Sequence, residues 1–203
     1  MTVEEKLGYI GGIDWMYTKS IDRLGIHRMR MSDGPQGIGT KGKSTAYPAT
    51  VTLAATWNEN LAYQYGKALG RDCRARNINV ILGPAVNIYR APMCGRNFEY
   101  MGEDPYLTSR ICVGYIKGVQ DQGVMATVKH FVANNSDYDR NNISNDIDER
   151  TLNEIYFPAY KAAIQEAEVG AIMTSYNLMN GIYTTENPWL LKEVLRNQWG
   201  FKG

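Results

Sequence analysis

Histidine is scarce in this chain of 203 residues, and His27 and His130 are the only two. Cysteine is scarce as well, since Cys73, Cys94 and Cys112 are odd in number and widely spaced. This combination fits neither a disulfide framework nor the ligand spacing of a zinc site. We therefore expect neither a metal nor another cofactor.

Long apolar runs and an excess of charge are also missing. No stretch approaches the roughly 18 apolar residues of a membrane-spanning helix, so a membrane protein is not expected. The net charge of +1 leaves no basic surface of the kind that binds nucleic acid. Residues 1–6 lack the apolar segment of a signal peptide, but a signal could have been removed. The compartment stays open among periplasmic, secreted and cytoplasmic.

Short apolar segments alternate with helix-like segments along the chain, whose composition is 44% hydrophobic and 21% charged, as in ordinary globular proteins. Strands are expected at residues 26–31, 51–55, 79–82, 124–131 and 171–175. Helices should follow the capping residues Thr2, Asn58, Asp104, Asp148 and Asn187. Within the helix expected at 148–169, Pro158 should produce a kink or mark the true start.

Such alternation is typical of a parallel sheet covered by helices. A (β/α)₈ barrel of the TIM type takes about 250 residues. The fold class we predict is therefore α/β, with residues 1–203 forming about the first five βα units of such a barrel. The whole chain would be one partial N-terminal catalytic barrel domain.

Ionisable side chains follow the expected strands. Asp33 comes after the first, Arg96 and Glu99 lie in the long loop 85–103, and Lys129 and His130 end the central strand. Because the carboxyl ends of barrel strands carry the chemistry, we expect these groups around one pocket. Their charges could form charge-assisted hydrogen bonds with several hydroxyls. The alternatives are an ordinary turn at Asp33 and a surface ion pair between Arg96 and Glu99.

Aromatic residues accompany these groups, and Trp57, Phe98 and Tyr176 could pack against the C–H face of a sugar. Glu99 is expected to be a partner of Arg96 or Lys129. Several segments now resemble, in order, the N-terminal barrel domain of family 3 glycoside hydrolases of the β-glucosidase type. They are Met31–Gly37, Leu53–Asn58, Gly83–Ile88, Gly95–Glu99, Gly102–Tyr106, Val128–Phe131, Thr174–Asn177 and Trp199–Gly203.

The resemblance implies a role for each candidate residue. Asp33 would hold two hydroxyls of a terminal sugar, and Arg96, Lys129 and His130 would grip the remaining hydroxyls. Arg140 would line the same subsite. The phenol of Tyr176 would contact the nucleophile and the ring oxygen. The family also implies cis peptide bonds in the Lys-His-Phe segment.

The resemblance further implies a retaining β-glucosidase that acts on terminal non-reducing β-D-glucosyl residues of a β-glucoside or oligosaccharide. Its nucleophile Asp and its acid/base Glu are expected beyond Gly203, so the chain itself would hold no catalytic residue and would be inactive alone. A complementary C-terminal polypeptide or a second copy is then an expected partner. The loop 132–137 has no histidine, which argues against the β-N-acetylglucosaminidase branch.

Two alternatives stay open. A β-xylosidase-type member usually has Trp-Ser-Glu where this chain has Ser32-Asp33-Gly34, which favours the glucosidase. The chain could also be a non-catalytic carbohydrate-binding or structural fragment.

Overall fold

A parallel sheet forms the centre of the computed structural model, which describes residues 1–39 and 42–203. The sheet is four-stranded, and its strands are ordered β1-β2-β3-β5. They are β1 (Met31–Asp33), β2 (Val80–Leu82), β3 (Met125–Phe131) and β5 (Ala171–Thr174). Each neighbouring pair is parallel. The carboxyl ends of all the strands therefore lie along the same edge of the sheet.

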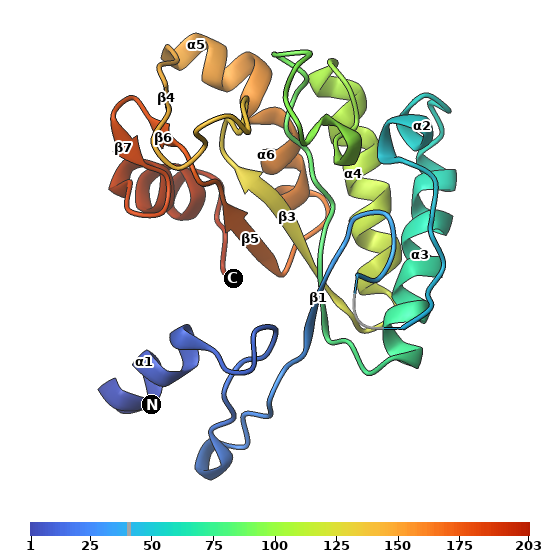
Figure 1. The fold of residues 1–203 in the computed structure, drawn as a ribbon, viewed down its shortest axis with the longest axis vertical. Coiled ribbons are helices and arrows are strands. Elements are labelled where there is room, and N and C mark those ends of the chain that lie inside the picture. Colours follow the sequence, from blue (N-terminus) through green and yellow to red (C-terminus); the bar gives the residue numbers. More distant parts are fainter. Residues whose placement is uncertain (40–41) are drawn as a thin grey trace.

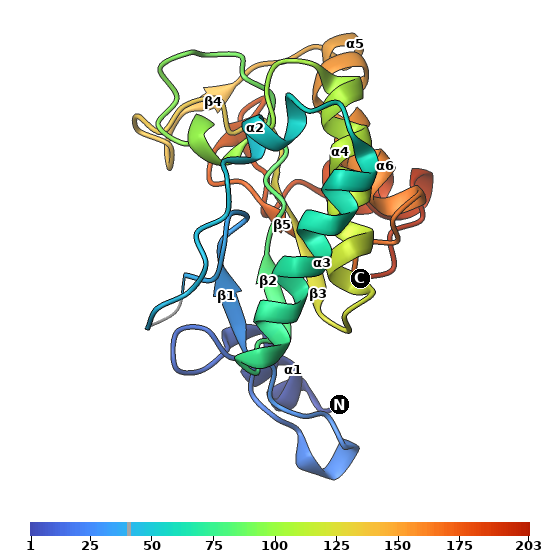
Figure 2. The same cartoon turned by 90° about the vertical axis from the view of Figure 1, so that its right-hand side faces the viewer.

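Three helices lie together on one side of this sheet (Figures 1 and 2). They are α3 (Glu59–Ala75), α4 (Pro105–Gln120) and α6 (Pro158–Gln165). The side chain of Asn58 caps α3 by accepting a hydrogen bond from the Leu61 backbone N–H at 2.9 Å. Asp104 caps α4 in the same way, with proline at the first helical position.

Glycines allow α3 and α4 to approach each other closely. A Cβ atom at Gly118 of α4 would lie 2.1 Å from the backbone oxygen of Tyr63, and one at Gly66 of α3 would lie 2.1 Å from that of Tyr115. Neither position can carry a larger side chain without moving a helix. This contact fixes the helical layer against which the sheet rests.

The apolar core lies between the sheet and this helical layer. Ala126, Val128 and Phe131 of β3 are fully buried. The ring of Phe131 meets that of Tyr160 edge to face at 5.1 Å and that of Trp199 at 6.0 Å. This packing holds the end of β3, where two ionisable residues of the site lie.

Several further elements complete the fold. They are α1 (Val3–Gly11), α2 (Thr50–Ala54), α5 (Glu149–Thr151) and a second sheet of β4 (Ser144–Asn145), β6 (Leu178–Met179) and β7 (Ile182–Tyr183). Residues Leu152–Tyr156 and Trp189–Gln198 are π-helical, and Asp22–Leu24 and Asn97–Glu99 form 3₁₀ turns. Figure 1 shows α1 apart from the helical layer.

The strand expected at 51–55 is wrong, because this segment is the helix α2. Its buried residues are Thr50, Leu53 and Ala54, which share one face of a helix but not of a strand. The hydroxyl of Thr50 also donates to the backbone oxygen of Glu99 at 2.8 Å. The short apolar run was compatible with either structure, and the face that it buries fits the helix.

Other boundaries differ less. The first strand begins at Met31 and not at residue 26, since Ile26 pairs instead with Ile21 in a tight turn. The helix expected at 148–169 is interrupted, and α6 begins at Pro158, one of the two outcomes expected of that proline. The expected α/β fold class with a parallel sheet is confirmed. Among the described residues, no helix is long and apolar enough to cross a membrane.

Candidate functional site

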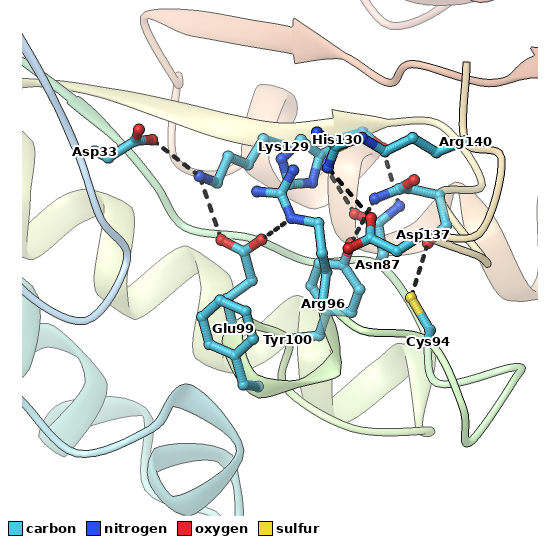
Figure 3. Close-up of polar contacts among 12 residues, drawn as sticks. Asp33, Asn87, Cys94, Arg96, Glu99, Tyr100, Lys129, His130, Asp137 and Arg140 are labelled. Carbon is cyan, nitrogen blue, oxygen red and sulfur yellow. Dashed lines mark hydrogen bonds and ion pairs between the residues drawn. The ribbon is translucent and has the colours of Figure 1, made fainter. Parts of the chain in front are cut away.

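The candidate residues meet at the carboxyl edge of the sheet. Asp33 ends β1, Lys129 and His130 lie near the end of β3, and Tyr176 follows β5. Arg96 and Glu99 come from the long loop after β2. Figure 3 shows the side chains of Asp33, Arg96, Glu99, Lys129 and His130 converging from separate elements. Parallel register thus brings together residues that are far apart in the sequence.

A chain of ion pairs joins three of these elements (Figure 3). The Lys129 ammonium lies 3.6 Å from the Asp33 carboxylate and 3.3 Å from that of Glu99. The other oxygen of Glu99 accepts a hydrogen bond from Nε of Arg96. Both of the expected partners of Glu99 are therefore present at once, and the expected alternative of a surface ion pair is wrong.

The charged groups of these ion pairs differ in their exposure to solvent. Lys129 and Glu99 are each 2% exposed, and a buried charge is tolerated only when it is paired. The side chain of Asp33, by contrast, is 58% exposed. The ion pairs therefore extend from the buried carboxylate of Glu99 to the exposed carboxylate of Asp33, which a ligand can reach.

A cavity of about 430 Å³ adjoins these charges. Its lining includes Asp33, Arg96, Glu99 and Lys129, together with Gln36 and Phe98. A larger cavity of about 690 Å³ lies on the helical side, against α4 and α6, and none of the candidate residues lines it. The smaller cavity is the one that coincides with the charged groups.

The backbone of His130 is held firmly. The amide of Asn87 makes two hydrogen bonds with it, accepting from the His130 N–H at 2.8 Å and donating to its carbonyl at 3.0 Å. The hydroxyl of Tyr160 donates to the same carbonyl at 2.7 Å. The Lys129–His130 peptide bond is cis, as the resemblance implied, and the second cis bond is Phe131–Val132, directly after the Lys-His-Phe segment.

The imidazole of His130 is neutral. Burial, followed by the charges of Arg96, Lys129 and Arg140, lowers the pKa of His130 to about 2. Its Nδ1 atom is buried and has no hydrogen-bond partner among the described residues. A neutral ring suits hydrogen bonding to a ligand and does not suit proton donation near pH 7.

Arg140 and Tyr176 pack together and form a separate wall, outside the residues that line the cavity. The guanidinium carbon of Arg140 lies 4.2 Å from the centroid of the Tyr176 ring, which is within cation–π range. The same guanidinium lies 3.3 Å from the carboxylate of Asp137. The Tyr176 and His130 rings are 6.5 Å apart, so this wall adjoins the buried imidazole.

The candidate residues are thus brought to one edge of the sheet, where Asp33, Arg96 and Lys129 line the cavity and His130, Arg140 and Tyr176 do not. Trp57 lies in the turn after α2 and does not line the cavity either. The structure adds Asn87, Asp137 and Tyr100 to the surroundings of the site. Asn87 lies in the segment Gly83–Ile88 directly after β2, which was the one available signal for it. Within residues 1–39 and 42–203, no group of three or more His, Cys, Asp or Glu side chains could hold a metal ion.

Comparison with known proteins identifies the family of the chain. Residues 12–203 match the model of the glycosyl hydrolase family 3 N-terminal domain. A β-glucosidase of Rhizobium radiobacter is 48% identical over 209 residues, which are 100% of this chain and 26% of that protein. Thermostable β-glucosidase B of Acetivibrio thermocellus is 45% identical over 215 residues, 100% of this chain and 28% of that protein.

Solved structures agree with these relatives. The β-glucosidase of Kluyveromyces marxianus, solved in complex with glucose, superposes with a TM-score of 0.97 at 39% identity and covers 100% of this chain and 25% of its own. The expected partial barrel of the TIM type is confirmed by such neighbours. The chain spans about a quarter of the length of the curated relatives it matches.

Proposed function

Because the chain belongs to glycosyl hydrolase family 3, we propose that its site binds the terminal sugar of a β-glucoside within a glycoside hydrolase of the β-glucosidase type. The substrate would be a β-glucoside or an oligosaccharide with a terminal non-reducing β-D-glucosyl residue. The observation that carries this proposal is the exposed carboxylate of Asp33 beside the buried Lys129, Glu99 and Arg96 at one cavity.

Each side chain has a chemistry that suits a sugar. A carboxylate accepts hydrogen bonds from two adjacent hydroxyls, and Asp33 is free to do so on its exposed side. Lys129 and Arg96 supply donors, and their charges strengthen the hydrogen bonds that they make. The neutral His130 and the guanidinium of Arg140 would complete the contacts, while the ring of Tyr176 would lie close to the reacting centre.

The proposed reaction proceeds with retention of configuration. Retaining glycosidases place two carboxyl groups about 5–5.5 Å apart, one as nucleophile and one as acid and base. Here Glu99 is buried and paired with two cations, and Asp33 is paired with Lys129, so neither is suited to donate a proton. The resemblance to family 3 implies an Asp nucleophile and a Glu acid/base, and we propose that both are residues outside 1–203.

Substitution of Asp33 tests the proposal in the active protein that carries residues 1–203. Asp33→Asn should lower kcat/KM for p-nitrophenyl β-D-glucoside by at least about tenfold, because an amide accepts fewer hydrogen bonds from the sugar. Glu186→Gln serves as a matched control, since Glu186 is exposed and lies outside the cavity. Equal activity of the two variants would remove Asp33 from the site.

The choice of chromogenic substrate separates the alternatives. Faster turnover of the β-D-xyloside than of the β-D-glucoside would favour a β-xylosidase-type member. Binding of glucose without turnover of either glycoside would favour a non-catalytic carbohydrate-binding module.

A further inference from the structure

Asp137 is a carboxylate beside the site for which the sugar contacts proposed above give no role. It is half-buried in the loop after β3, and its Oδ1 atom lies 3.3 Å from Nη1 of Arg140. On its other side it contacts Gly95, where an added Cβ atom would lie 3.1 Å from its Oδ2 atom. Asp137 therefore lies between the loop that carries Arg96 and the guanidinium of Arg140, and Figure 3 shows its side chain beside that of Arg140.

The guanidinium of Arg140 is held from two directions. The Asp137 carboxylate lies 3.3 Å from its Nη1 atom, and the centroid of the Tyr176 ring lies 4.2 Å from its carbon atom. A planar guanidinium presents several donors in fixed directions, so its orientation decides which ligand atoms it can reach. An exposed ion pair three residues apart would do little to orient a guanidinium. Here, however, Asp137 packs against the loop at Gly95 and Arg140 packs against the ring of Tyr176.

Each of the three cations of the site has at least one carboxylate partner. Lys129 has Asp33 and Glu99 as partners, Arg96 has Glu99, and Arg140 has Asp137. Without Asp137, Arg140 would be a cation near Lys129 and Arg96 with no carboxylate of its own. Repulsion among like charges would then favour rotamers of Arg140 that point toward solvent.

We propose that Asp137 is a positioning residue that holds the guanidinium of Arg140 against the ring of Tyr176, so that both side chains face the bound sugar. The inference rests on the proposed function of the site. Asp137 itself would not touch the substrate, and its contribution passes through Arg140.

Kinetics of the active protein that carries residues 1–203 give the first test. Asp137→Asn should lower kcat/KM for p-nitrophenyl β-D-glucoside by about tenfold. The control is Asp139→Asn, the same substitution in the same loop, since Asp139 is exposed and bonds only the nearby Asn142 side chain and loop amides. This control should stay within about twofold of the unmodified protein.

A double substitution shows whether the effect passes through Arg140. In an Arg140→Ala background, Asp137→Asn should cost less than about twofold, because the group that it positions is gone. An undiminished loss in that background would overturn the proposal, as would equal activity of Asp137→Asn and Asp139→Asn.

Crystal structures of the two loop variants give a test that needs no activity. The guanidinium of Arg140 should lie beyond about 6 Å of the Tyr176 ring centroid in Asp137→Asn and should remain stacked in Asp139→Asn. A stacked guanidinium in Asp137→Asn would overturn the positioning role. Failure of the unmodified protein to hydrolyse any β-glycoside would instead contradict the proposed function, and the crystal structures would still decide the role of Asp137.

Discussion

Loss of the buried carboxylate at Glu99 should destabilise the fold far more than loss of an exposed one. Glu99→Gln keeps the shape of the side chain and removes its charge. The ammonium of Lys129, which is 2% exposed, would then retain only the exposed Asp33, at 3.6 Å. Removing one partner of a buried ion pair costs about 3–5 kcal/mol, because the other charge stays buried without compensation.

The remaining pair with Asp33 places the expected loss near the lower limit, at about 3 kcal/mol in the free energy of unfolding. That is a large share of the roughly 5–15 kcal/mol that stabilises an ordinary domain. Urea denaturation of the two proteins at neutral pH measures the difference. The slope of the transition should not change, since the folded and unfolded surfaces are the same.

Glu154→Gln is the matched control for Glu99→Gln. It breaks the pair between Arg150 and Glu154, whose side chains are 83% and 59% exposed, and it should cost less than about 1 kcal/mol. Adding Lys129→Met to Glu99→Gln should recover part of the stability, because no unpaired ammonium then remains. A loss as small as that of Glu154→Gln, or no recovery in the double variant, would refute this reasoning about buried charge.

Other predictions concern His130 and the helical layer. Because burial and nearby cations lower the pKa of His130 to about 2 in the folded protein, the imidazole of His130 binds a proton near pH 6.5 only in the unfolded chain. The contribution of His130 to the free energy of unfolding should therefore fall as the pH drops below about 6.5, by up to about 1.4 kcal/mol per pH unit. In urea titrations, His130→Gln should remove this contribution to the pH dependence, and an unchanged pH dependence would contradict the neutral imidazole. In the active protein, His130→Gln should weaken turnover yet keep both limbs of the pH–rate profile, and loss of one limb would make His130 the titrating catalyst. Gly118→Ala should destabilise the protein by about 1–3 kcal/mol, since its Cβ would lie 2.1 Å from the Tyr63 backbone oxygen. Gly11→Ala, whose Cβ would have nothing within 4 Å, should stabilise the protein by about 0.5–1 kcal/mol. Similar shifts of the melting temperature in the two variants would refute the close helix contact.

Local sequence signals were reliable where they depend on nearby residues. Asn58 and Asp104 cap the helices expected after them, and Pro158 begins α6. A cap or a proline acts within one helical turn, so its effect can be seen in a few residues of sequence. The short apolar run 51–55 had no such signal, and in the structure it forms a helix that buries Leu53 and Ala54 and is tied to Glu99 by the Thr50 hydroxyl.

The sequence also indicated part of the candidate site. The sequence placed Asp33, Arg96, Lys129, His130 and Tyr176 after strands, and parallel strands that end at one edge bring them together. Family motifs in their expected order were enough to indicate the kind of site, and the comparisons confirmed the family. The sugar contacts of these residues stay a prediction.

What the sequence by itself determined is the alternation of elements, the residues that follow the strands and the family. Only the tertiary structure decided the pairing: Glu99 holds both Arg96 and Lys129, Asn87 binds the backbone of His130, and Asp137 lies between Gly95 and Arg140. Most of these contacts join residues far apart in the chain, and each depends on the direction of a side chain. Such directions are set by strand register and core packing, which a local pattern of residue types does not specify.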